Sequence, residues 1–584
     1  MDKRILAIIV AAIVLVAGVG AYIALNNGHG GSAHPSASAF PEAVSEESRV
    51  LPTDLTTLRT ESQTLIDTLS TAIESGTADE MNAAAQAAGD RLTEMRDWLS
   101  WATVYYYISP STEATAFASW TELAQWYDDS LETLLHNALS GDRADLVETA
   151  IGYTDLKVSD IRNYIPLGET ALQLKAQDTQ LTTQYQTIMA TEYTYSYNGT
   201  SWTVSTAQSS ATLTDTEKAT IIGAIYTEQL TAAATVYVQL VEVRNDFAQE
   251  LGLGNYLDYA YNNTFYRGYT YQDVQETLQV TLTTGSTYQS LITAISTDER
   301  FLASSLSSLT EKGTDWMYST IGSFMGSIDG TMGEFMTYMV DQNLINYAQN
   351  GINGAFTTPL VKAHSAVLYI GSSDIETFRT LVHELGHAAD AALSPLANNM
   401  CYDIAETQSQ ALEALMCVKA SEYIGDLSSN FTALVFANFA NTLYMGSAVA
   451  ELEIWAYTTE ASGTKLTVDS LNDHFRSTLD ADYPLTTVFD TGLYWAQVGH
   501  MFASPGYYVS YVTSVLNSLE IFMTANEDLD KGIDLYLSVL YQGVDDGYVN
   551  TITSCGLSNM LEADNASKIV EYFKTYVAQM LASS

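Results

Sequence analysis

Two histidines four residues apart, with a glutamate beside the first, are the residues of this sequence best suited to chemistry: His383-Glu384-Leu385-Gly386-His387. On a helix this spacing places both imidazoles on one face, where they can bind one Zn²⁺ through two nitrogens. Glu384 would lie beside the metal and could take a proton from a zinc-bound water. With Glu406 as third ligand, the site would keep one coordination position open, which is typical of catalytic zinc.

The surrounding residues favour the helix that this spacing requires. Ser373-Asp374-Ile375-Glu376 is a candidate capping box, and the pattern predicts a helix end near Ser394-Pro395. Apolar residues keep helical spacing at Ile375, Phe378, Leu381 and Leu385. A second helix is expected to begin near Asp403 and to carry Glu406. Gly386 has no side chain, so it would let this second helix approach closely. The alternative is a solvated helix with two unrelated histidines.

Composition restricts the class of partner. The 584 residues include 23 Lys and Arg against 69 Asp and Glu, which gives a formal net charge of −46. Nucleic-acid binding needs clustered cations, so we expect no nucleic-acid partner. Such an acidic, polar surface suits a protein exposed outside the cytoplasm.

The N-terminal residues 1–25 have the features of a membrane segment. An uncharged run from Ile5 to Leu25 follows Lys3 and Arg4, and as a helix it would span about 31 Å, close to the thickness of a bilayer. The cations before the run predict that the N-terminus stays inside and the body is exported. A cleaved signal peptide is the alternative, because Ser36-Ala37-Ser38-Ala39 offers small residues for cleavage. Residues 26–50 are expected to form a flexible linker.

Two further regions follow the linker. Residues 51–235 are predicted to be helical, with a β-hairpin at 193–204 that turns at Asn198-Gly199. Residues 236–584 are predicted to form the catalytic region. The three cysteines, Cys401, Cys417 and Cys555, make no disulfide framework, and we interpret them as mostly buried thiols, although one pair involving Cys555 stays open.

From about Val241 onward the chain resembles a known family, the zinc oligopeptidases related to thimet oligopeptidase, neurolysin and oligoendopeptidase F. The resemblance is greatest in Asp403-Ile404-Ala405-Glu406-Thr407-Gln408-Ser409-Gln410, where Glu406 falls on the third zinc ligand. Leu251-Gly252-Leu253-Gly254-Asn255-Tyr256 is similar to a turn ahead of the catalytic half. His500 followed by Pro505-Gly506-Tyr507-Tyr508-Val509-Ser510-Tyr511 is similar to the family's histidine and tyrosine cluster.

The resemblance implies a predominantly α-helical fold with two helical halves around a deep substrate cleft and a small β-sheet beside the His383–His387 helix. It also implies roles outside the ligand set. Glu413 would orient a ligand histidine, and Asp403 would lie near it in the surroundings of the metal. His500, Tyr508 and Tyr511 would stabilise an oxyanion or hold the substrate, and Tyr507 could replace Tyr508 in register.

A strand at Ala366-Val367-Leu368-Tyr369-Ile370, approached through Gly354-Ala355-Phe356-Thr357, is also implied by the resemblance. In the family such an edge pairs with an extended peptide. Tyr369 and Gly354 are therefore candidate substrate-binding residues. An ordinary buried strand is the alternative.

Two features depart from the family. Asp390 stands where a third histidine usually follows the motif, and eighteen residues separate His387 from Glu406, fewer than is usual. Eighteen is the spacing of aminopeptidases with a Gly-x-Met-Glu-Asn motif, which this chain lacks. The shorter loop affects the expected shape of the cleft and leaves the ligand set unchanged.

Together these patterns predict an enzyme that holds one Zn²⁺ per chain and hydrolyses internal bonds of short peptides outside the cytoplasm, tethered to the membrane by its N-terminal helix. A zinc carboxy- or aminopeptidase is the first alternative, and it would need a group that captures a peptide terminus. The second is a surface protein that binds peptides without turnover, although Glu384 and all three ligands are present.

Overall fold

Helices dominate the structure, a computed structural model that describes residues 43–583 apart from 155, 157, 349–350, 353, 372–374, 395–400, 480–487 and 543–546. The predicted membrane segment, 1–25, lies outside the described residues, as do residues 26–42 of the predicted linker. The prediction of a predominantly α-helical chain with a small sheet beside the His383–His387 helix is confirmed.

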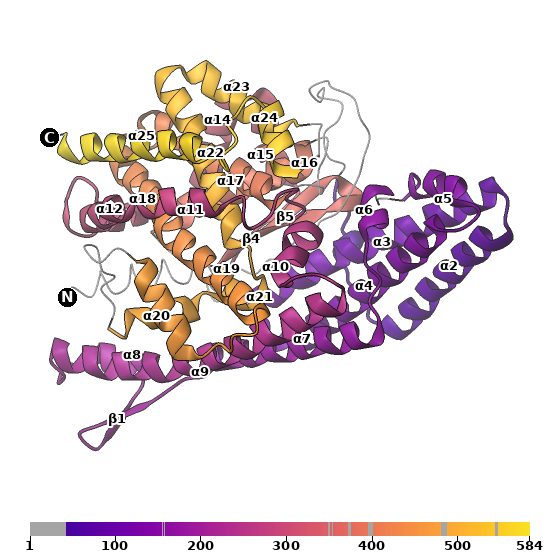
Figure 1. The fold of residues 1–584 in the computed structure, drawn as a ribbon. Coiled ribbons are helices and arrows are strands. Elements are labelled where there is room, and N and C mark those ends of the chain that lie inside the picture. Colours follow the sequence, from indigo (N-terminus) through magenta and orange to yellow (C-terminus); the bar gives the residue numbers. More distant parts are fainter. Residues whose placement is uncertain are drawn as a thin grey trace.

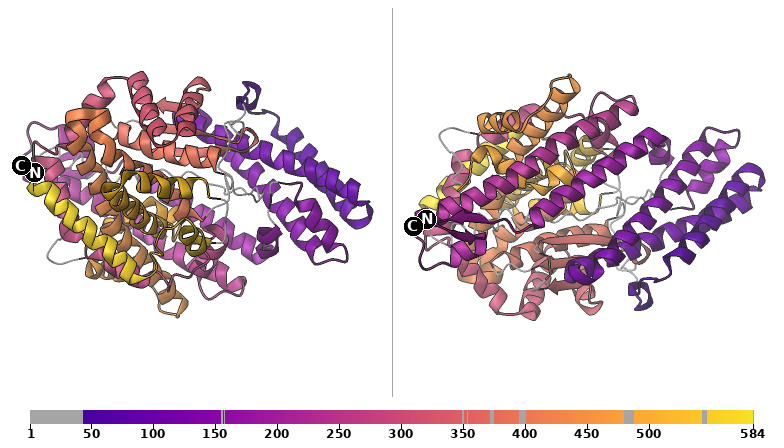
Figure 2. Two further views of the ribbon diagram at one scale, coloured as in Figure 1. Left: turned by 90° about the horizontal axis from the view of Figure 1, so that it is seen from above. Right: turned by 90° about the horizontal axis from the view of Figure 1, so that it is seen from below.

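The first long helices form a bundle that projects from the rest of the molecule (Figures 1 and 2). They are α2 (Leu55–Ser75), α3 (Ala78–Ile108), α4 (Pro110–Leu139), α5 (Ala144–Ile151) and α6 (Val158–Asn163). The bundle has an apolar core of its own, in which Leu69, Met81 and Tyr127 are fully buried. The Thr77 side chain and Glu80 form a capping box that starts α3.

The predicted hairpin is present between two helices that run along the base of the molecule in Figure 1. The elements are α7 (Glu169–Ala190), β1 (Tyr195–Tyr197), β2 (Thr200–Trp202), α8 (Val204–Ser209) and α9 (Asp215–Glu250). Asn198 and Gly199 both have positive φ, 50° and 78°, as a type I′ turn requires. Helix α9 runs through the predicted boundary at 235/236, and both Leu230 and Leu240 are buried in the main core, so no structural break marks that boundary.

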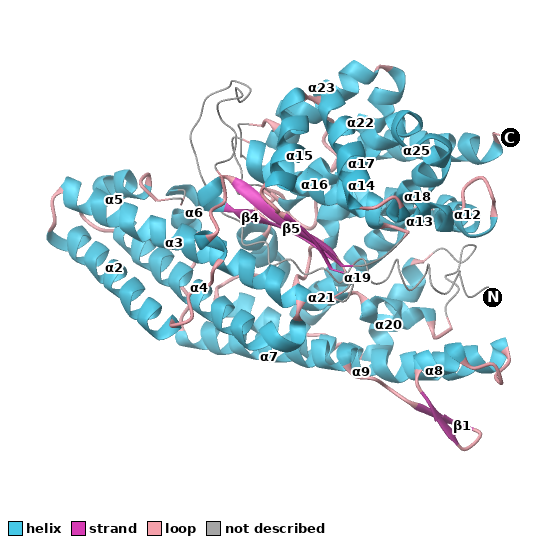
Figure 3. Cartoon of the chain, turned by 180° about the vertical axis from the view of Figure 1, so that it is seen from behind, coloured by secondary structure: helices cyan, strands magenta, loops and turns pink. Residues whose placement is uncertain are grey.

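A three-stranded sheet lies beside the predicted metal site. Its strands are β3 (Ile345–Ala348), β4 (Ala355–Leu360) and β5 (Ser365–Gly371), in the order β3-β5-β4. Strand β5 is parallel to β3 and antiparallel to β4, so β5 is central and β4 is an edge strand. The side chains of Phe356 and Thr357 point to opposite faces: Phe356 packs on Tyr107 of α3, and Thr357 bonds to Glu384 of α16. The sheet is thus held between these two helices (Figure 3).

The remaining elements build the main body around this sheet. They are η2 (Glu47–Arg49), α10 (Tyr256–Tyr259), η3 (Ala260–Thr264), α11 (Gln275–Leu282), α12 (Gly285–Thr297), η4 (Ala303–Leu306), α13 (Ser307–Glu311), α14 (Thr314–Ile328), α15 (Gly330–Asp341), η5 (Val361–Ala363), α16 (Thr377–Leu393), α17 (Tyr402–Ile424), η6 (Gly425–Leu427), α18 (Ser428–Asn441), η7 (Thr442–Gly446), α19 (Ser447–Ala461), α20 (Val468–Thr478), η8 (Thr491–Gln497), α21 (Gly499–Ala503), α22 (Tyr508–Glu527), α23 (Leu529–Leu540), α24 (Gly547–Ser554) and α25 (Ala563–Ala582). Helix α17 packs against α16, α18, α22 and α23, which makes it the centre of the core.

Within the described residues, one helical stretch, Tyr402–Ala461, is long and apolar enough to cross a membrane by length and composition alone. However, 83% of its most apolar window is buried inside the molecule, and the stretch includes α17. We therefore assign its apolar character to core packing. Cys401, Cys417 and Cys555 are buried thiols that form no disulfide with one another, in agreement with the prediction of mostly buried thiols.

Candidate active site

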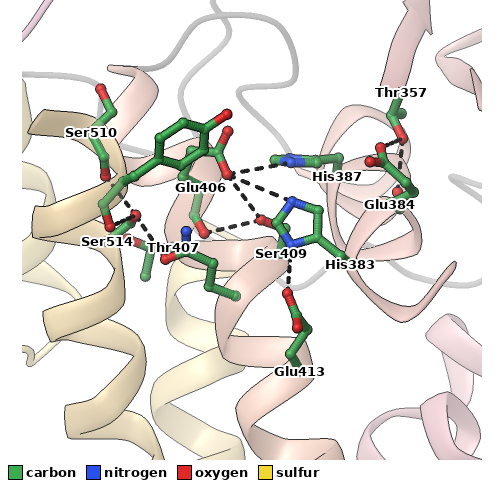
Figure 4. Close-up of polar contacts among 12 residues, drawn as sticks. Thr357, His383, Glu384, His387, Glu406, Thr407, Ser409, Glu413, Ser510 and Ser514 are labelled. Carbon is green, nitrogen blue, oxygen red and sulfur yellow. Dashed lines mark hydrogen bonds and ion pairs between the residues drawn. The ribbon is translucent and has the colours of Figure 1, made fainter. Parts of the chain in front are cut away.

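Three side chains with metal-binding atoms converge between α16 and α17. The Nε2 atoms of His383 and His387 lie 3.8 and 3.7 Å from Oε2 of Glu406 (Figure 4). One ligand atom from each residue lies within 4.8 Å of the other two. Ligands about 2.0–2.1 Å from a tetrahedral zinc are about 3.3 Å apart, so both carboxylate–imidazole distances are within about 0.5 Å of the spacing that one ion requires. Two imidazole nitrogens and a carboxylate are also the ligand types of catalytic zinc.

The close approach of α16 and α17 depends on Gly386, as the sequence predicted. A Cβ atom at this position would lie 2.6 Å from Cα of Ser409. The start of α16 differs from the prediction. Helix α16 begins at Thr377 with Glu376 as N-cap, and no side-chain capping bond is made there; Ser373 and Asp374 lie outside the described residues. The Glu376 carboxylate instead pairs with Arg379 at 3.0 Å.

A buried chain of charges fixes the orientation of His383. Oε1 of Glu413 lies 2.7 Å from Nδ1 of His383, which leaves Nε2 facing the metal position (Figure 4). Oε2 of the same carboxylate accepts a hydrogen bond from Arg379 at 3.0 Å. Burial opposes ionisation of Glu413, but the Arg379 charge and the bond to His383 outweigh it and hold its pKa below the ordinary value. Arg379 was not identified from the sequence, although it lies four residues before His383, on the same helix face.

Glu384 faces the cavity from the same helix turn. Its side chain is 5% exposed and its Oε2 accepts a hydrogen bond of 2.8 Å from Thr357 of β4. Burial raises the pKa of Glu384 to about 7. A carboxylate with a pKa near neutrality is suited to taking and returning a proton. Thr357 is 27 positions away in the sequence, and no local pattern connects the two residues.

The predicted histidine and tyrosine cluster lies at the same cavity, whose volume is about 310 Å³. His500, Tyr507, Tyr508 and Tyr511 all line it. The Tyr507 hydroxyl donates a 2.6 Å hydrogen bond to Oε1 of Glu406. Burial lowers the pKa of His500 to about 4, and burial raises the pKa values of Tyr508 and Tyr511 well above the ordinary value. These side chains are therefore neutral hydrogen-bond donors near pH 7.

The structure corrects the predicted substrate contacts on the strand. Because β5 is the central strand, the Tyr369 side chain is fully buried, and its hydroxyl donates to the Ile352 carbonyl at 2.7 Å. Gly354 does not line the cavity; its carbonyl accepts a hydrogen bond from the Gly371 amide at 2.7 Å. The strand that lines the cavity is β4, through Ala355, Phe356 and Thr357.

Asp403 lies one helical turn before Glu406, and its side chain is fully buried. Its carboxylate pairs with Nε of Arg267 at 3.1 Å and accepts a 2.5 Å hydrogen bond from the Tyr269 hydroxyl. Both of these hydrogen-bond partners of the Asp403 carboxylate lie on the segment before α11, and neither is a side chain that would bind the metal. Arg267, 136 positions away, was not identified from the sequence.

Comparisons with known proteins agree with this geometry. Residues 373–568 match the model of peptidase family M3. A structure of PZ peptidase A with an inhibitor has a similar fold, with a TM-score of 0.67 at 15% identity over 90% of this chain and 97% of the other. Oligoendopeptidase-F from Enterococcus faecium is also similar, with a TM-score of 0.55 at 11% identity over 90% of this chain and 98% of the other. The search of curated protein sequences gave no match.

The fold, the convergent ligand atoms and the adjacent glutamate define a metallopeptidase of the HExxH class. The part of the chain that carries the site, residues 373–568, is the part that matches peptidase family M3.

Proposed function

We propose that the protein is a zinc-dependent endopeptidase that cleaves internal bonds of short peptides. The observation that carries the proposal is the content of one cavity: three ligand side chains, a buried glutamate with a pKa near 7, and neutral phenol and imidazole donors. One Zn²⁺ per chain would be held by His383, His387 and Glu406. When bound there, zinc supplies Lewis acidity, which polarises a peptide carbonyl and makes water acidic enough to attack near pH 7.

The side chains of this cavity can perform the proton transfers. Glu384 accepts a proton from the attacking water and delivers it to the nitrogen of the leaving amine, so that each cleavage returns the carboxylate to its starting state. His500, Tyr508 and Tyr511 donate hydrogen bonds to the oxyanion that forms on the carbonyl oxygen. Tyr507 and Glu413 keep Glu406 and His383 in orientation through the bonds described above.

The edge of β4 provides a way to hold an extended peptide. The Gly371 amide of β5 donates to the Gly354 carbonyl, just before β4 begins. In an antiparallel pair every second residue bonds to the partner strand, so the residues of β4 alternate between bonding to β5 and facing away from it. The alternation directs the backbone groups of Ala355 and Thr357 away from β5. The next residue of β4 that faces away from β5 is Pro359, and its carbonyl already accepts a 2.8 Å hydrogen bond from Ser100 of α3. The part of the edge that can still pair with a peptide is therefore Ala355 to Thr357. A peptide could therefore pair with β4 beside Glu384.

The charge distribution of the cavity favours an endopeptidase over an exopeptidase. Among its described lining residues Arg379 is the one cation, and this side chain pairs with Glu376 and Glu413. It is therefore engaged and poorly placed to capture a peptide carboxylate. Of the three described lining carboxylates, Glu406 belongs to the ligand set, Glu413 pairs with Arg379, and Glu384 alone is left, so no free acidic pair is available for a terminal amine. Because Glu384, Glu406, His500 and Tyr508 are buried at the cavity, a short extended peptide would reach them more easily than a folded protein.

We also propose that the catalytic body is exported and tethered by residues 1–25. The support is the sequence alone: the uncharged run after Lys3 and Arg4 and the strongly acidic composition. Cell fractionation and external protease treatment test this proposal. A membrane-bound chain digested in intact cells supports it, and a chain protected inside the cytoplasm contradicts it.

Peptides with blocked ends test the cleavage mode. We expect the full chain to cleave a peptide of about ten residues at an internal bond whether its termini are free or acetylated and amidated. Cleavage of the free peptide alone, one or two residues from an end, would contradict the endopeptidase assignment and favour the exopeptidase.

A further inference from the structure

Arg267 is a fully buried cation that connects the metal-ligand helix to the tyrosine cluster. Its Nε donates to Asp403 of α17 at 3.1 Å. Its Nη2 donates to the carbonyl oxygen of Gly506 at 2.9 Å and to the hydroxyl of Ser510 at 2.8 Å. Gly506 and Ser510 flank Tyr507 and Tyr508 in sequence. One guanidinium therefore contacts both parts of the site, yet it is not among the cavity-lining residues.

These contacts close a ring. From Asp403 the ring passes through Arg267 to the Gly506 carbonyl, and the next residue, Tyr507, bonds to Glu406 at 2.6 Å. Glu406 lies three residues after Asp403 on α17, so the backbone of one helical turn completes the ring. A closed ring of short contacts fixes the distance between the tyrosine cluster and the ligand Glu406.

The Gly506 peptide is held from the other side as well. Its amide donates to Oε1 of buried Glu453 at 3.0 Å, while its carbonyl accepts from Arg267. Gly506 has φ of +85°, a conformation that side chains other than glycine rarely adopt. The turn before Tyr508 is thus specified by its own backbone and by the side chains of Arg267 and Glu453.

The segment that carries Arg267 has an unusual backbone. The π-helix η3 precedes it, and Tyr266 has a φ of +50°. Such features cost free energy and are concentrated at functional sites. The rings of Tyr261 and Phe265 lie 4.2 and 4.5 Å from the guanidinium carbon, so the cation is also held by aromatic faces. This conformation delivers Arg267 to a position between α17 and the Gly506 turn.

We propose that Arg267 is the positioning residue that sets Tyr507, Tyr508 and Tyr511 at their working distance from the metal ligands, by holding the Gly506 carbonyl against Asp403. It touches neither substrate nor metal and acts through the tyrosines. The inference rests on the proposed peptidase function and adds a residue to it.

A double-mutant cycle tests this role. Lys keeps the positive charge of Arg267 but lacks the planar fork that bonds Asp403 and Gly506 together. For Arg267→Lys we expect kcat to fall about 10- to 100-fold, because misplacing reacting groups by about 1 Å has effects of that size. We expect KM and zinc content to change less than about threefold, because no ligand side chain is replaced and Glu413 still orients His383.

The second mutation of the cycle is Tyr508→Phe, which removes a proposed oxyanion donor. Because Arg267 acts through Tyr508 as well as Tyr507 and Tyr511, Arg267→Lys should lower kcat by a clearly smaller factor in the Tyr508→Phe background than in the wild-type background. If the double mutant loses kcat by the product of the two single-mutant factors, the inference is overturned. An Arg267→Lys enzyme with wild-type kcat would also overturn it. A wild-type chain that cleaves no peptide would overturn the proposed function and this inference with it.

Two further variants separate positioning from stability. Arg96→Lys is the matched control, because Arg96 is also buried and pairs with Asp128 at 2.8 Å, but in the projecting bundle. We expect it to lower the unfolding midpoint of the metal-free protein and to leave kcat unchanged; a comparable loss of kcat in Arg96→Lys would assign the Arg267 effect to stability. If Arg267→Lys does not fold, Arg267→Met with Asp403→Leu removes the buried pair as a unit, and the same cycle with Tyr508→Phe decides the question.

Discussion

Replacing Gly386 with alanine should damage both stability and metal binding, because α16 and α17 touch at this residue. An alanine Cβ would lie 2.6 Å from Cα of Ser409 and 3.1 Å from the carbonyl oxygen of Gln408. Both are backbone atoms, which no side-chain rotation can move away, so the helices must separate by roughly 1 Å. Overpacking of this kind costs about 1–3 kcal/mol of unfolding free energy.

The same separation moves two ligands apart. His387 follows Gly386 directly, and Glu406 lies three residues before Ser409. Ligand positions tolerate shifts of only about 0.2 Å, so we expect zinc affinity to fall about tenfold or more. Chelator competition measures the affinity, and chemical unfolding of the metal-free protein measures the stability.

Gly330→Ala is the control for Gly386→Ala, because it changes the first residue of α15, where an added Cβ meets nothing within 4 Å. It should alter the unfolding free energy by less than about 0.5 kcal/mol and leave zinc affinity unchanged. If Gly386→Ala behaved like this control, the close helix crossing would not be needed to assemble the site, and our reasoning about it would be refuted.

Two other substitutions give separate tests. Glu413→Gln keeps an acceptor for Nδ1 of His383 but removes the negative charge, so zinc affinity should fall about 10- to 100-fold in chelator competition; an unchanged affinity would contradict the orienting role. Asp390→Asn tests a buried carboxyl group whose pKa burial raises from 3.8 to about 7, although hydrogen bonds from Gln408 and Ser394 oppose the rise. Between pH 4 and 7 the folded state binds this proton more strongly than the unfolded state, so rising pH destabilises the wild type, by of order 4 kcal/mol at most, and the variant should lack that contribution. Parallel plots of unfolding midpoint against pH for the two proteins would refute this assignment.

Features with a local cause could be predicted from the sequence. The spacing of His383 and His387 required only a helix, and the small size of Gly386 indicated the neighbouring helix. Asn198-Gly199 specified its turn because both residues tolerate positive φ. In each case the decisive interaction is within a few residues or follows from one residue's shape.

Features with a distant cause were missed or misplaced. The apolar sequence of β5 fits an edge or a central strand equally well, and its pairing with both β3 and β4 decided the matter and buried Tyr369. Glu384 bonds to Thr357, which lies 27 positions away in the sequence. Asp403 pairs with Arg267, which lies 136 positions away. Such pairs depend on how elements pack, and residue spacing carries no signal for them.

The most direct test of the central claim compares wild type, Glu384→Gln and chelator-treated protein on a peptide blocked at both ends, with bound zinc quantified in each sample. Our account predicts about one zinc per chain in the first two samples, internal cleavage by the wild type, and a loss of kcat of at least about 100-fold in Glu384→Gln. Removal of zinc should abolish cleavage, and its return should restore it. Undiminished cleavage by Glu384→Gln, or a wild-type protein that binds no zinc, would contradict the account.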